Sequence, residues 1–101
     1  MSRARIAIPE PELADFCRRN HIQRLSLFGS VLRDDFTPES DVDVLVEFEP
    51  GARISLFDQV RIEDELGELL GRKVDLVSRK YLSKYLRDRV FAEEEMLYVA
   101  A

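Results

Sequence analysis

The sequence has few of the residues that build disulfide frameworks or zinc sites. Its 101 residues include one cysteine, one histidine and no tryptophan. The single Cys17 excludes an internal disulfide and, among apolar helix positions, is expected in the core. Without a cluster of cysteine and histidine, a zinc site is not expected. His21 follows Asn20 at an expected helix end, which favours a capping or surface role over catalysis.

Long apolar runs and an excess of basic charge are also missing. No run approaches the roughly 18–20 apolar residues that cross a membrane, and the stretch before Pro9 has no apolar segment typical of a signal peptide. The net charge of -5 argues against binding along a nucleic-acid backbone, although not against one nucleotide held through metal ions. We therefore expect a cytoplasmic protein that binds neither membranes nor nucleic acid.

The residues that are present describe one globular domain. The hydrophobic fraction of 46% and the charged fraction of 35% are typical of a folded protein. A chain of this length supports one core, so residues 1–101 are predicted to form a single domain.

Apolar periodicity predicts that helices and strands alternate along the chain. Helices are expected over residues 11–20, 55–70 and 79–92, and strands over residues 22–28, 41–48, 73–77 and 96–99. A short helical turn at 30–33 and a polar loop at 34–40 separate the first two strands. This alternation favours an α+β fold, with a small mixed sheet of about four strands covered by helices.

The two later helices carry broad apolar faces. The stretch Ser55-x-x-Asp58 resembles a capping box, and Gly71 ends the helix that it starts. The apolar residues of that helix cover about half of its wheel: Leu56, Val60, Ile62, Leu66, Leu69 and Leu70. In the last helix, the residues expected to face inward are Leu82, Tyr85, Leu86 and Val90. Leu56, Phe57 and the last helix could form an interface, but core packing is the expected role.

Two aspartates interrupt the valine-rich strand at 41–48. Asp41 and Asp43 are two residues apart, so on a strand both side chains point to one face, with Cα atoms roughly 6.5–7 Å apart. Such a pair would repel unless a cation lay between the carboxylates, and their hard oxygen atoms suit Mg²⁺. The alternative is a pair of solvated aspartates at the edge of a strand.

A Gly-Ser pair precedes the aspartates by ten residues. Gly29 and Ser30 end the strand at 22–28 and open a helical turn. Glycine lets the backbone approach a phosphate, and the first N–H groups of a helix point toward an anion. Gly-Ser alone is also an ordinary turn, but its combination with Asp-x-Asp at this spacing is specific.

A third carboxylate, Asp75, lies inside the apolar run of the third expected strand. If that strand lies beside the second one, Asp75 reaches the same metals as Asp41 and Asp43. The alternative is a surface ion pair with Arg72 or Lys73.

These residues resemble the minimal nucleotidyltransferases of the DNA polymerase beta superfamily. The pattern Gly-Ser, ten residues, Asp-x-Asp is met by Gly29, Ser30, Asp41 and Asp43, and Asp75 stands where the family has its third carboxylate. The resemblance covers nearly the whole chain, including the stretches SLFDQVRIEDELGELLGRKVDLVS and YLRDRVFAEEEMLY. It implies the nucleotidyltransferase fold.

The resemblance also implies the transfer of AMP from ATP with release of pyrophosphate. By that analogy, Gly29 and Ser30 hold the β/γ end of the triphosphate. Asp41 and Asp43 ligate two Mg²⁺ ions, while Asp75 ligates the ion that activates the acceptor hydroxyl and can take its proton. Two such ions stabilise both the attacking and the leaving oxygen atoms.

The charged residues Arg33, Asp34 and Asp35, which follow the Gly-Ser pair, bear on nucleotide binding. Arg33 occupies the position of the family's usual basic residue, so it either contacts a phosphate or is an exposed charge at a helix end. Asp34 and Asp35 follow where the family commonly has glycine. If their charges pointed inward, they would weaken binding of the triphosphate.

Many proteins of this family resemble the antitoxin half of a pair whose toxin is a helical HEPN-type ribonuclease. The resemblance implies that the acceptor is a tyrosine hydroxyl of such a toxin, which forms a hetero-oligomer with the antitoxin. Two alternatives stay open: an antitoxin that neutralises its partner by binding alone, and an enzyme that modifies a small molecule. The second alternative is expected to need a helical substrate-binding domain, which this sequence does not contain.

Overall fold

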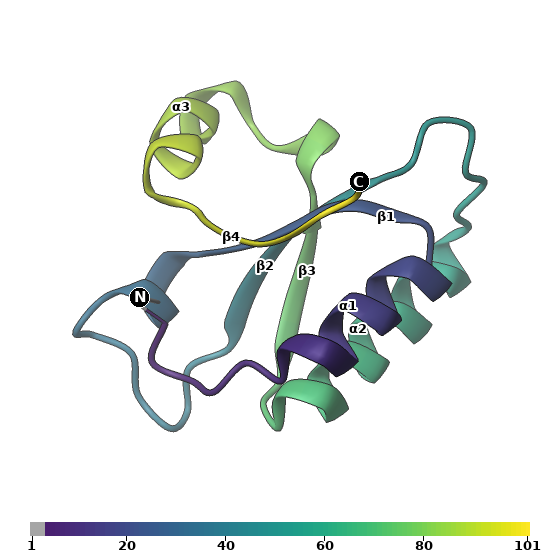
Figure 1. Cartoon of the computed structure of the whole chain (residues 1–101). Coiled ribbons are helices and arrows are strands. Elements are labelled where there is room, and N and C mark those ends of the chain that lie inside the picture. The colour runs from purple at the N-terminus through teal and green to yellow at the C-terminus, as the bar shows by residue number, and fades with distance from the viewer. Residues whose placement is uncertain (1–3) are drawn as a thin grey trace.

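Helices and strands alternate along the chain in the computed structural model, which describes residues 4–101 (Figure 1). Within this range the elements are α1 (Glu10–Arg19), β1 (Ile22–Phe28), the 3-10 turn η1 (Gly29–Leu32), β2 (Val42–Phe48), α2 (Leu56–Leu70), β3 (Val74–Ser78), the 3-10 turn η2 (Arg79–Tyr81), α3 (Lys84–Glu93) and β4 (Glu95–Val99). The predicted strands and the first two predicted helices are confirmed to within about two residues at their ends.

The strands form one mixed sheet in the order β3-β2-β1-β4. β1 is antiparallel to both β2 and β4, whereas β2 and β3 are parallel. α1 and α2 lie on one face of the sheet, and α3 lies on the other (Figure 1). The predicted α+β class is therefore confirmed. In the part of the chain that the structure describes, no helix is long and apolar enough to cross a bilayer.

Local signals set the ends of the first two helices. α1 begins after Pro9 with acidic residues in its first turn and basic residues in its last, which complements the helix dipole. The chain then turns at His21, whose φ is 57°. The Ser55 hydroxyl accepts the Asp58 N–H at 3.1 Å, and the Asp58 carboxylate accepts the Ser55 N–H at 2.9 Å. The predicted capping box is thus confirmed, as is the predicted helix end at Gly71.

The main core lies between the sheet and the pair α1 and α2. Its buried residues are Leu13, Phe16, Cys17, Ile22, Leu25, Leu27, Val31, Val42, Val44, Val46, Ile62, Leu66, Leu70 and Val74. Burial raises the pKa of the Cys17 thiol to about 12, so this cysteine is unreactive at neutral pH and its predicted core role is confirmed. His21 lies on the surface, with Nδ1 3.8 Å from Glu49 Oε2.

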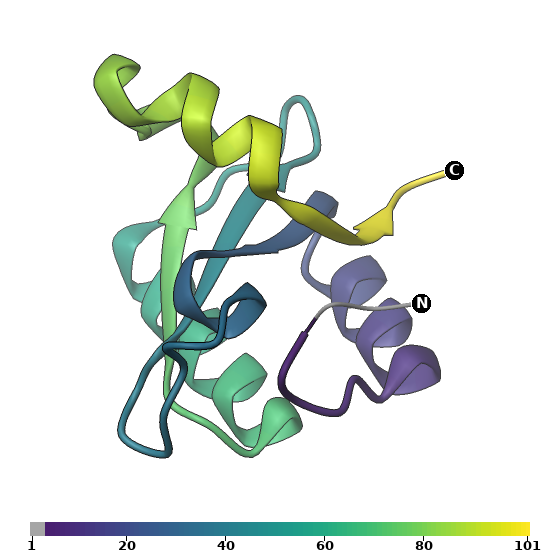
Figure 2. The same ribbon diagram turned by 90° about the vertical axis from the view of Figure 1, so that its left-hand side faces the viewer.

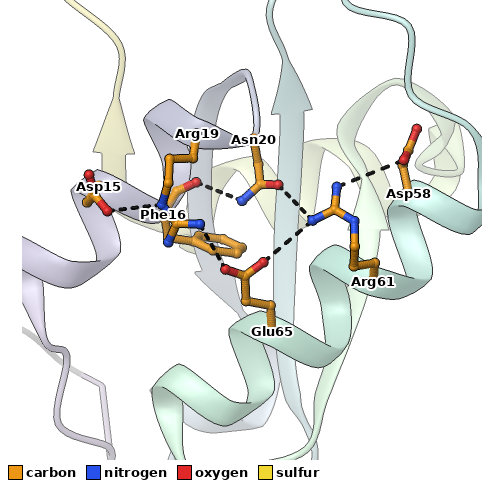
Figure 3. Close-up of polar contacts among 7 residues, drawn as sticks. All are labelled: Asp15, Phe16, Arg19, Asn20, Asp58, Arg61 and Glu65. Atoms are coloured by element: carbon orange, nitrogen blue, oxygen red, sulfur yellow. Dashed lines mark hydrogen bonds and ion pairs between the residues drawn. The ribbon is translucent and has the colours of Figure 1, made fainter.

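Polar contacts join the end of α1 to the middle of α2 (Figure 3). Arg61 donates to the side-chain oxygen of Asn20 at 3.3 Å, and the Asn20 amide donates to the Phe16 carbonyl at 2.9 Å. Arg19 donates to Glu65 at 3.1 Å. Because Arg61 and Glu65 are one turn apart, these contacts hold one side of α2 against the end of α1.

The last predicted helix is interrupted. Instead of one helix over residues 79–92, the chain forms η2, an extended link and then α3. The link changes the helical phase, so Tyr85 and Leu86 do not share a face with Leu82. Leu82 and Val90 are buried, as predicted, but Tyr85 is 86% exposed and Leu86 is 49% exposed. The inward orientation predicted for Tyr85 and Leu86 is wrong.

The buried stripe of α2 is narrower than its apolar face. Ile62, Leu66 and Leu70, spaced four residues apart, are buried against the sheet. The exposed apolar residues of this helix are Leu56, Phe57 and Val60. Leu56 and Phe57 are 77% and 88% exposed, so the core packing predicted for them is wrong. A helix that contacts a sheet on one side buries a single stripe, and its first turn lies outside that stripe here.

Candidate active site

Two of the three predicted carboxylates lie opposite each other on neighbouring strands. β2 and β3 are parallel, and Asp43 pairs with Asp75. Val42 and Val44 belong to the main core, so Asp43 points to the opposite face of the sheet, where α3 lies. Asp41 comes just before β2, two residues from Asp43. The condition set by the sequence, that the third strand lies beside the second, is therefore met.

The negative charges of these aspartates act on one another. The pKa of Asp43 is raised above its ordinary value of 3.8, first because burial disfavours the charged form, and then because the charges of Asp75 and Asp41 lie close. The guanidinium of Arg33 opposes part of this shift. A bound cation would relieve the repulsion, which is the electrostatic property expected of a metal-binding carboxylate group.

The turn at Gly29 passes directly over Asp43. β1 ends at Phe28, which pairs with Asp43, and Gly29 follows with a φ of 78°. A Cβ atom on Gly29 would overlap with Asp43 Oδ2, so no other residue fits here unless that carboxylate moves. The phosphate contact of Gly29 stays a prediction, and the structure adds a second reason for glycine at this position.

Ser30 and Arg33 are positioned by η1. The Ser30 carbonyl accepts the Arg33 N–H at 2.9 Å. Arg33 Nε lies 3.4 Å from Asp35 Oδ1, and its Nη1 lies 3.4 Å from Glu93 Oε1. The charge of Arg33 also lowers the pKa of Asp43, so its guanidinium lies near enough to act on the carboxylate group. A phosphate that bound Arg33 would have to replace Asp35 and Glu93.

Asp34 and Asp35 are exposed, and each forms an ion pair with an arginine. The Asp34 side chain is 95% exposed and forms an ion pair with Arg5, and the Asp35 side chain is 67% exposed beside Arg33. Neither is among the charges that raise the pKa of Asp43. Asp34 is therefore directed to Arg5, whereas Asp35 occupies the guanidinium of Arg33 that a phosphate would have to bind.

Arg72 holds the loop that leads into Asp41. Its Nη2 donates to three carbonyls at 2.8, 3.2 and 2.8 Å, those of Thr37, Pro38 and Ser40. Its guanidinium also lies 4.4 Å from the centre of the Phe36 ring. Arg72 itself lies just before β3, and it thus fixes the backbone just before Asp41.

Asp75 does not form the surface ion pair that was the alternative to a role in metal binding. Among the described residues, no ion pair joins it to Arg72 or Lys73. The neighbouring N–H of Leu76 is instead bound by Glu63 Oε2 at 2.8 Å, which closes the outer edge of β3. Sequence reasoning missed both Arg72 and Glu63 because each binds backbone groups far away in the chain, which leave no side-chain pattern.

The carboxylate group fits magnesium by its chemistry. Asp41, Asp43 and Asp75 offer only charged oxygen donors, which are the ligands that Mg²⁺ prefers. Within residues 4–101, however, no three acidic, histidine or cysteine side chains are already arranged as metal ligands. The aspartate side chains would therefore have to rotate in order to hold one ion together.

Comparison with known proteins identifies the family. The model of the family described as "Nucleotidyltransferase domain" matches residues 11–99, which include every predicted site residue. MJ0435 of Methanocaldococcus jannaschii, provisionally named a protein adenylyltransferase, is 40% identical over 75 residues, 74% of this chain and 78% of its own. The protein adenylyltransferase MntA of Thermococcus cleftensis is 36% identical over 78 residues, 77% of this chain and 75% of its own.

A solved structure shares the fold. It contains a tri-AMPylated HEPN toxin of Shewanella oneidensis in complex with an MNT antitoxin. The matched chain superposes with a TM-score of 0.64 at 24% identity, over 90% of this chain and 70% of its own length. At this identity the likeness shows the fold alone. Family model, relatives and fold agree with the resemblance seen in the sequence: the chain belongs to the nucleotidyltransferase domain family and is a nucleotidyltransferase.

Proposed function

We propose that this protein transfers AMP from ATP to a tyrosine hydroxyl of a HEPN-type ribonuclease toxin, with Mg²⁺ as cofactor, and so acts as its antitoxin. The observation that carries the proposal is the pairing of Asp43 with Asp75 beside the turn at Gly29. The names of the relatives favour a protein acceptor. The complex of an MNT antitoxin with an AMPylated HEPN toxin favours this kind of partner.

The residues of the site divide the reaction between them. The N–H groups of the turn at Gly29 and the Ser30 hydroxyl donate to the outer phosphates of ATP. Asp41, Asp43 and Asp75 would hold the Mg²⁺ ions, which neutralise the triphosphate and align the attacking and leaving oxygens when bound. Asp75 accepts the proton of the tyrosine hydroxyl. At the same time the tyrosine oxygen bonds to the α-phosphorus, and pyrophosphate leaves.

Arg33 adds a positive charge to the triphosphate side of the site. In the structure its guanidinium lies between Asp35 and Glu93. The arrival of a phosphate would exchange these carboxylates for a more highly charged anion, and Arg33 can bind it with two parallel hydrogen bonds.

Mass spectrometry tests the proposal directly. A HEPN-type protein is incubated with this protein, ATP and Mg²⁺, and its intact mass is measured. We expect a mass gain of one AMP or a small multiple of it, which disappears with the double variant Asp41→Ala/Asp43→Ala.

Asp15→Ala/Asp64→Ala is the matched control, since it removes two exposed aspartates of α1 and α2, on the other face of the sheet (Figure 1), and it should retain the transfer. If the wild-type protein forms a stable complex with the HEPN-type protein but adds no mass, the catalytic proposal is wrong. That result would identify an antitoxin that acts by binding alone.

A further inference from the structure

A basic segment stands out in this acidic protein. Residues 79–89 contain five basic residues and one acidic residue, a net charge of +4, although the whole chain has a net charge of -5. The basic residues are Arg79, Lys80, Lys84, Arg87 and Arg89. Since η2 and most of α3 make up this segment, we call it the basic arm.

Apart from Arg79 and Leu82, the basic arm is exposed, and it carries two tyrosines. Within α3 only Val90, beyond the end of the arm, is buried. Tyr81 and Tyr85 are 74% and 86% exposed. Lys80 Nζ and Lys84 Nζ lie 5.2 and 5.5 Å from the centres of the neighbouring tyrosine rings. Exposed tyrosines are enriched at protein interfaces relative to the rest of a protein surface.

The base of the arm is firmly attached to the sheet. Arg79 Nη1 donates to Glu94 Oε1 at 2.8 Å, and its guanidinium lies 4.1 Å from the centre of the Phe91 ring. Leu82 and Val90 are buried in a small second cluster. Arg79 and Phe91 also line a cavity of about 750 Å³ beside the arm. The arm therefore presents its charges from a fixed base, and α3 projects beyond the edge of the sheet (Figure 2).

The arm and the carboxylate group share one face of the sheet. α3 is on the same face of the sheet as Asp43 and Asp75, as the topology requires (Figure 1). Its last residue, Glu93, lies 3.4 Å from Arg33, whose charge acts on Asp43. A molecule that covers the arm and the end of α3 is thus held on the face of the sheet that carries the predicted site of transfer.

We propose that the basic arm is the docking surface for the acceptor protein, and that this protein presents an acidic surface to it. The inference rests on the proposed function, because it names the surface that holds the same acceptor. Protein is favoured over RNA, since the chain as a whole has a net charge of -5 and would repel a phosphate backbone. The two exposed tyrosines and Leu86 suit a protein surface as well.

Charge reversal in the arm tests the proposal. Lys84 is the first residue of α3, so glutamate there suits the helix dipole and should leave the fold intact. We expect Lys84→Glu to weaken binding of the HEPN-type protein, and Lys80→Glu/Lys84→Glu to weaken it at least about tenfold, with a smaller dependence on salt than in the wild type. Binding is measured by isothermal titration calorimetry at two salt concentrations.

Arg18→Glu is the matched control for Lys84→Glu. Arg18 is exposed on α1, across the sheet from the arm, and the substitution makes the same change in charge. It should leave the affinity for the HEPN-type protein within about twofold. Circular dichroism confirms folding, and the shift in melting temperature with MgATP shows in every variant whether the nucleotide site is intact.

The outcomes separate the two proposals. If wild type binds and modifies the HEPN-type protein but Lys80→Glu/Lys84→Glu does so equally well, the docking proposal is overturned and the proposed function stands. If wild type neither binds nor modifies it, the proposed function fails and the docking proposal fails with it. If the same double variant loses only the binding of a fluorescein-labelled oligouridine, measured by anisotropy, the arm is an RNA-binding surface instead.

Discussion

The two faces of the sheet differ sharply in how they are covered. Between the sheet and α1 and α2 lie fourteen buried apolar residues, whereas the cluster under α3 has three. The first face is also joined by contacts between α1 and α2, including that from Arg19 to Glu65 (Figure 3). The second face leaves Asp43, Asp75 and the basic arm accessible to ligands. One face therefore supplies most of the stability, and the other is available for binding and chemistry.

A single strand serves both faces. In β2, Val42, Val44 and Val46 belong to the main core, while Asp43 and Leu45 point to the side of α3. Because side chains alternate along a strand, the charge of Asp43 is separated by one residue from a closely packed interior. The main core can thus hold the aspartates in place without burying them completely.

The largest expected effect on stability lies on the face of the sheet that α1 and α2 cover. Phe16 is 1% exposed in the main core, so Phe16→Ala should lower the free energy of unfolding by about 3–5 kcal/mol. Tyr85→Ala removes an aromatic ring from α3 and should cost less than about 0.5 kcal/mol, because that ring is exposed. Urea unfolding followed by circular dichroism measures both. Equal losses would show that α3 contributes as much as α1 to the core.

The largest expected effect on activity lies on the other face. Asp43→Asn keeps the shape of the side chain but removes a charge from the carboxylate group, so AMP transfer should fall by at least about a hundredfold. The initial rate is measured with radiolabelled ATP at saturating Mg²⁺. The proposed role of Asp43 would be abandoned if the variant kept more than half of the wild-type rate.

Gly29→Ala should lower both the stability of the protein and the rate of AMP transfer. The added Cβ overlaps with Asp43 Oδ2, and the φ of 78° disfavours alanine, so stability should fall by about 1–3 kcal/mol. Transfer should fall further than this loss explains, because the Asp43 carboxylate must move. Gly51→Ala is the control, since Gly51 has φ 85° but nothing within 4 Å of its added Cβ. Equal transfer rates in the two variants would show that the close contact between Gly29 and Asp43 has no role in transfer.

A smaller effect is expected at the start of α2. Ser55→Ala removes the hydroxyl that accepts the Asp58 N–H and should lower stability by about 1 kcal/mol. AMP transfer should be unchanged, since Ser55 caps α2, which lies on the face of the sheet opposite the aspartates. Thermal unfolding and the transfer rate are compared for the same preparation, and a loss of transfer without a loss of stability would break the division between the faces.

The smallest effect is a pH dependence of stability that originates at Asp43. Folding raises its pKa above 3.8, so the charged form is disfavoured in the folded state and the group lowers stability above its folded pKa. Below 3.8 both states are protonated and this penalty is absent. In EDTA, Asp43→Asn should therefore melt above the wild type at neutral pH, and the gap should close as the pH falls toward 3.8. A gap that widens toward acid would contradict the sign of the shift.

The secondary structure and the motif could be predicted because their causes are local. The capping pair Ser55 and Asp58, the helix end at Gly71 and the spacing of Asp41 and Asp43 all act within a few residues. The α+β class followed from the alternation of these elements. The family also followed from the motif, and the family model matches residues 11–99.

Tertiary structure decided which apolar residues are buried and which polar groups meet. A sequence pattern shows the apolar side of a helix but not how much of it finds a partner, so Leu56, Phe57 and Tyr85 were placed wrongly. The anchoring of the loop by Arg72 depends on carbonyl groups more than thirty residues away.

The sequence by itself determined the elements, their order and the three aspartates that the motif singles out. Only the tertiary structure decided that Asp43 lies opposite Asp75, that Gly29 passes over Asp43, and that α3 lies on the same face of the sheet as these aspartates (Figure 1). The physical reason is that helix caps and strand periods are properties of neighbouring residues. Register between strands and the exposure of a face depend instead on the packing of the whole chain.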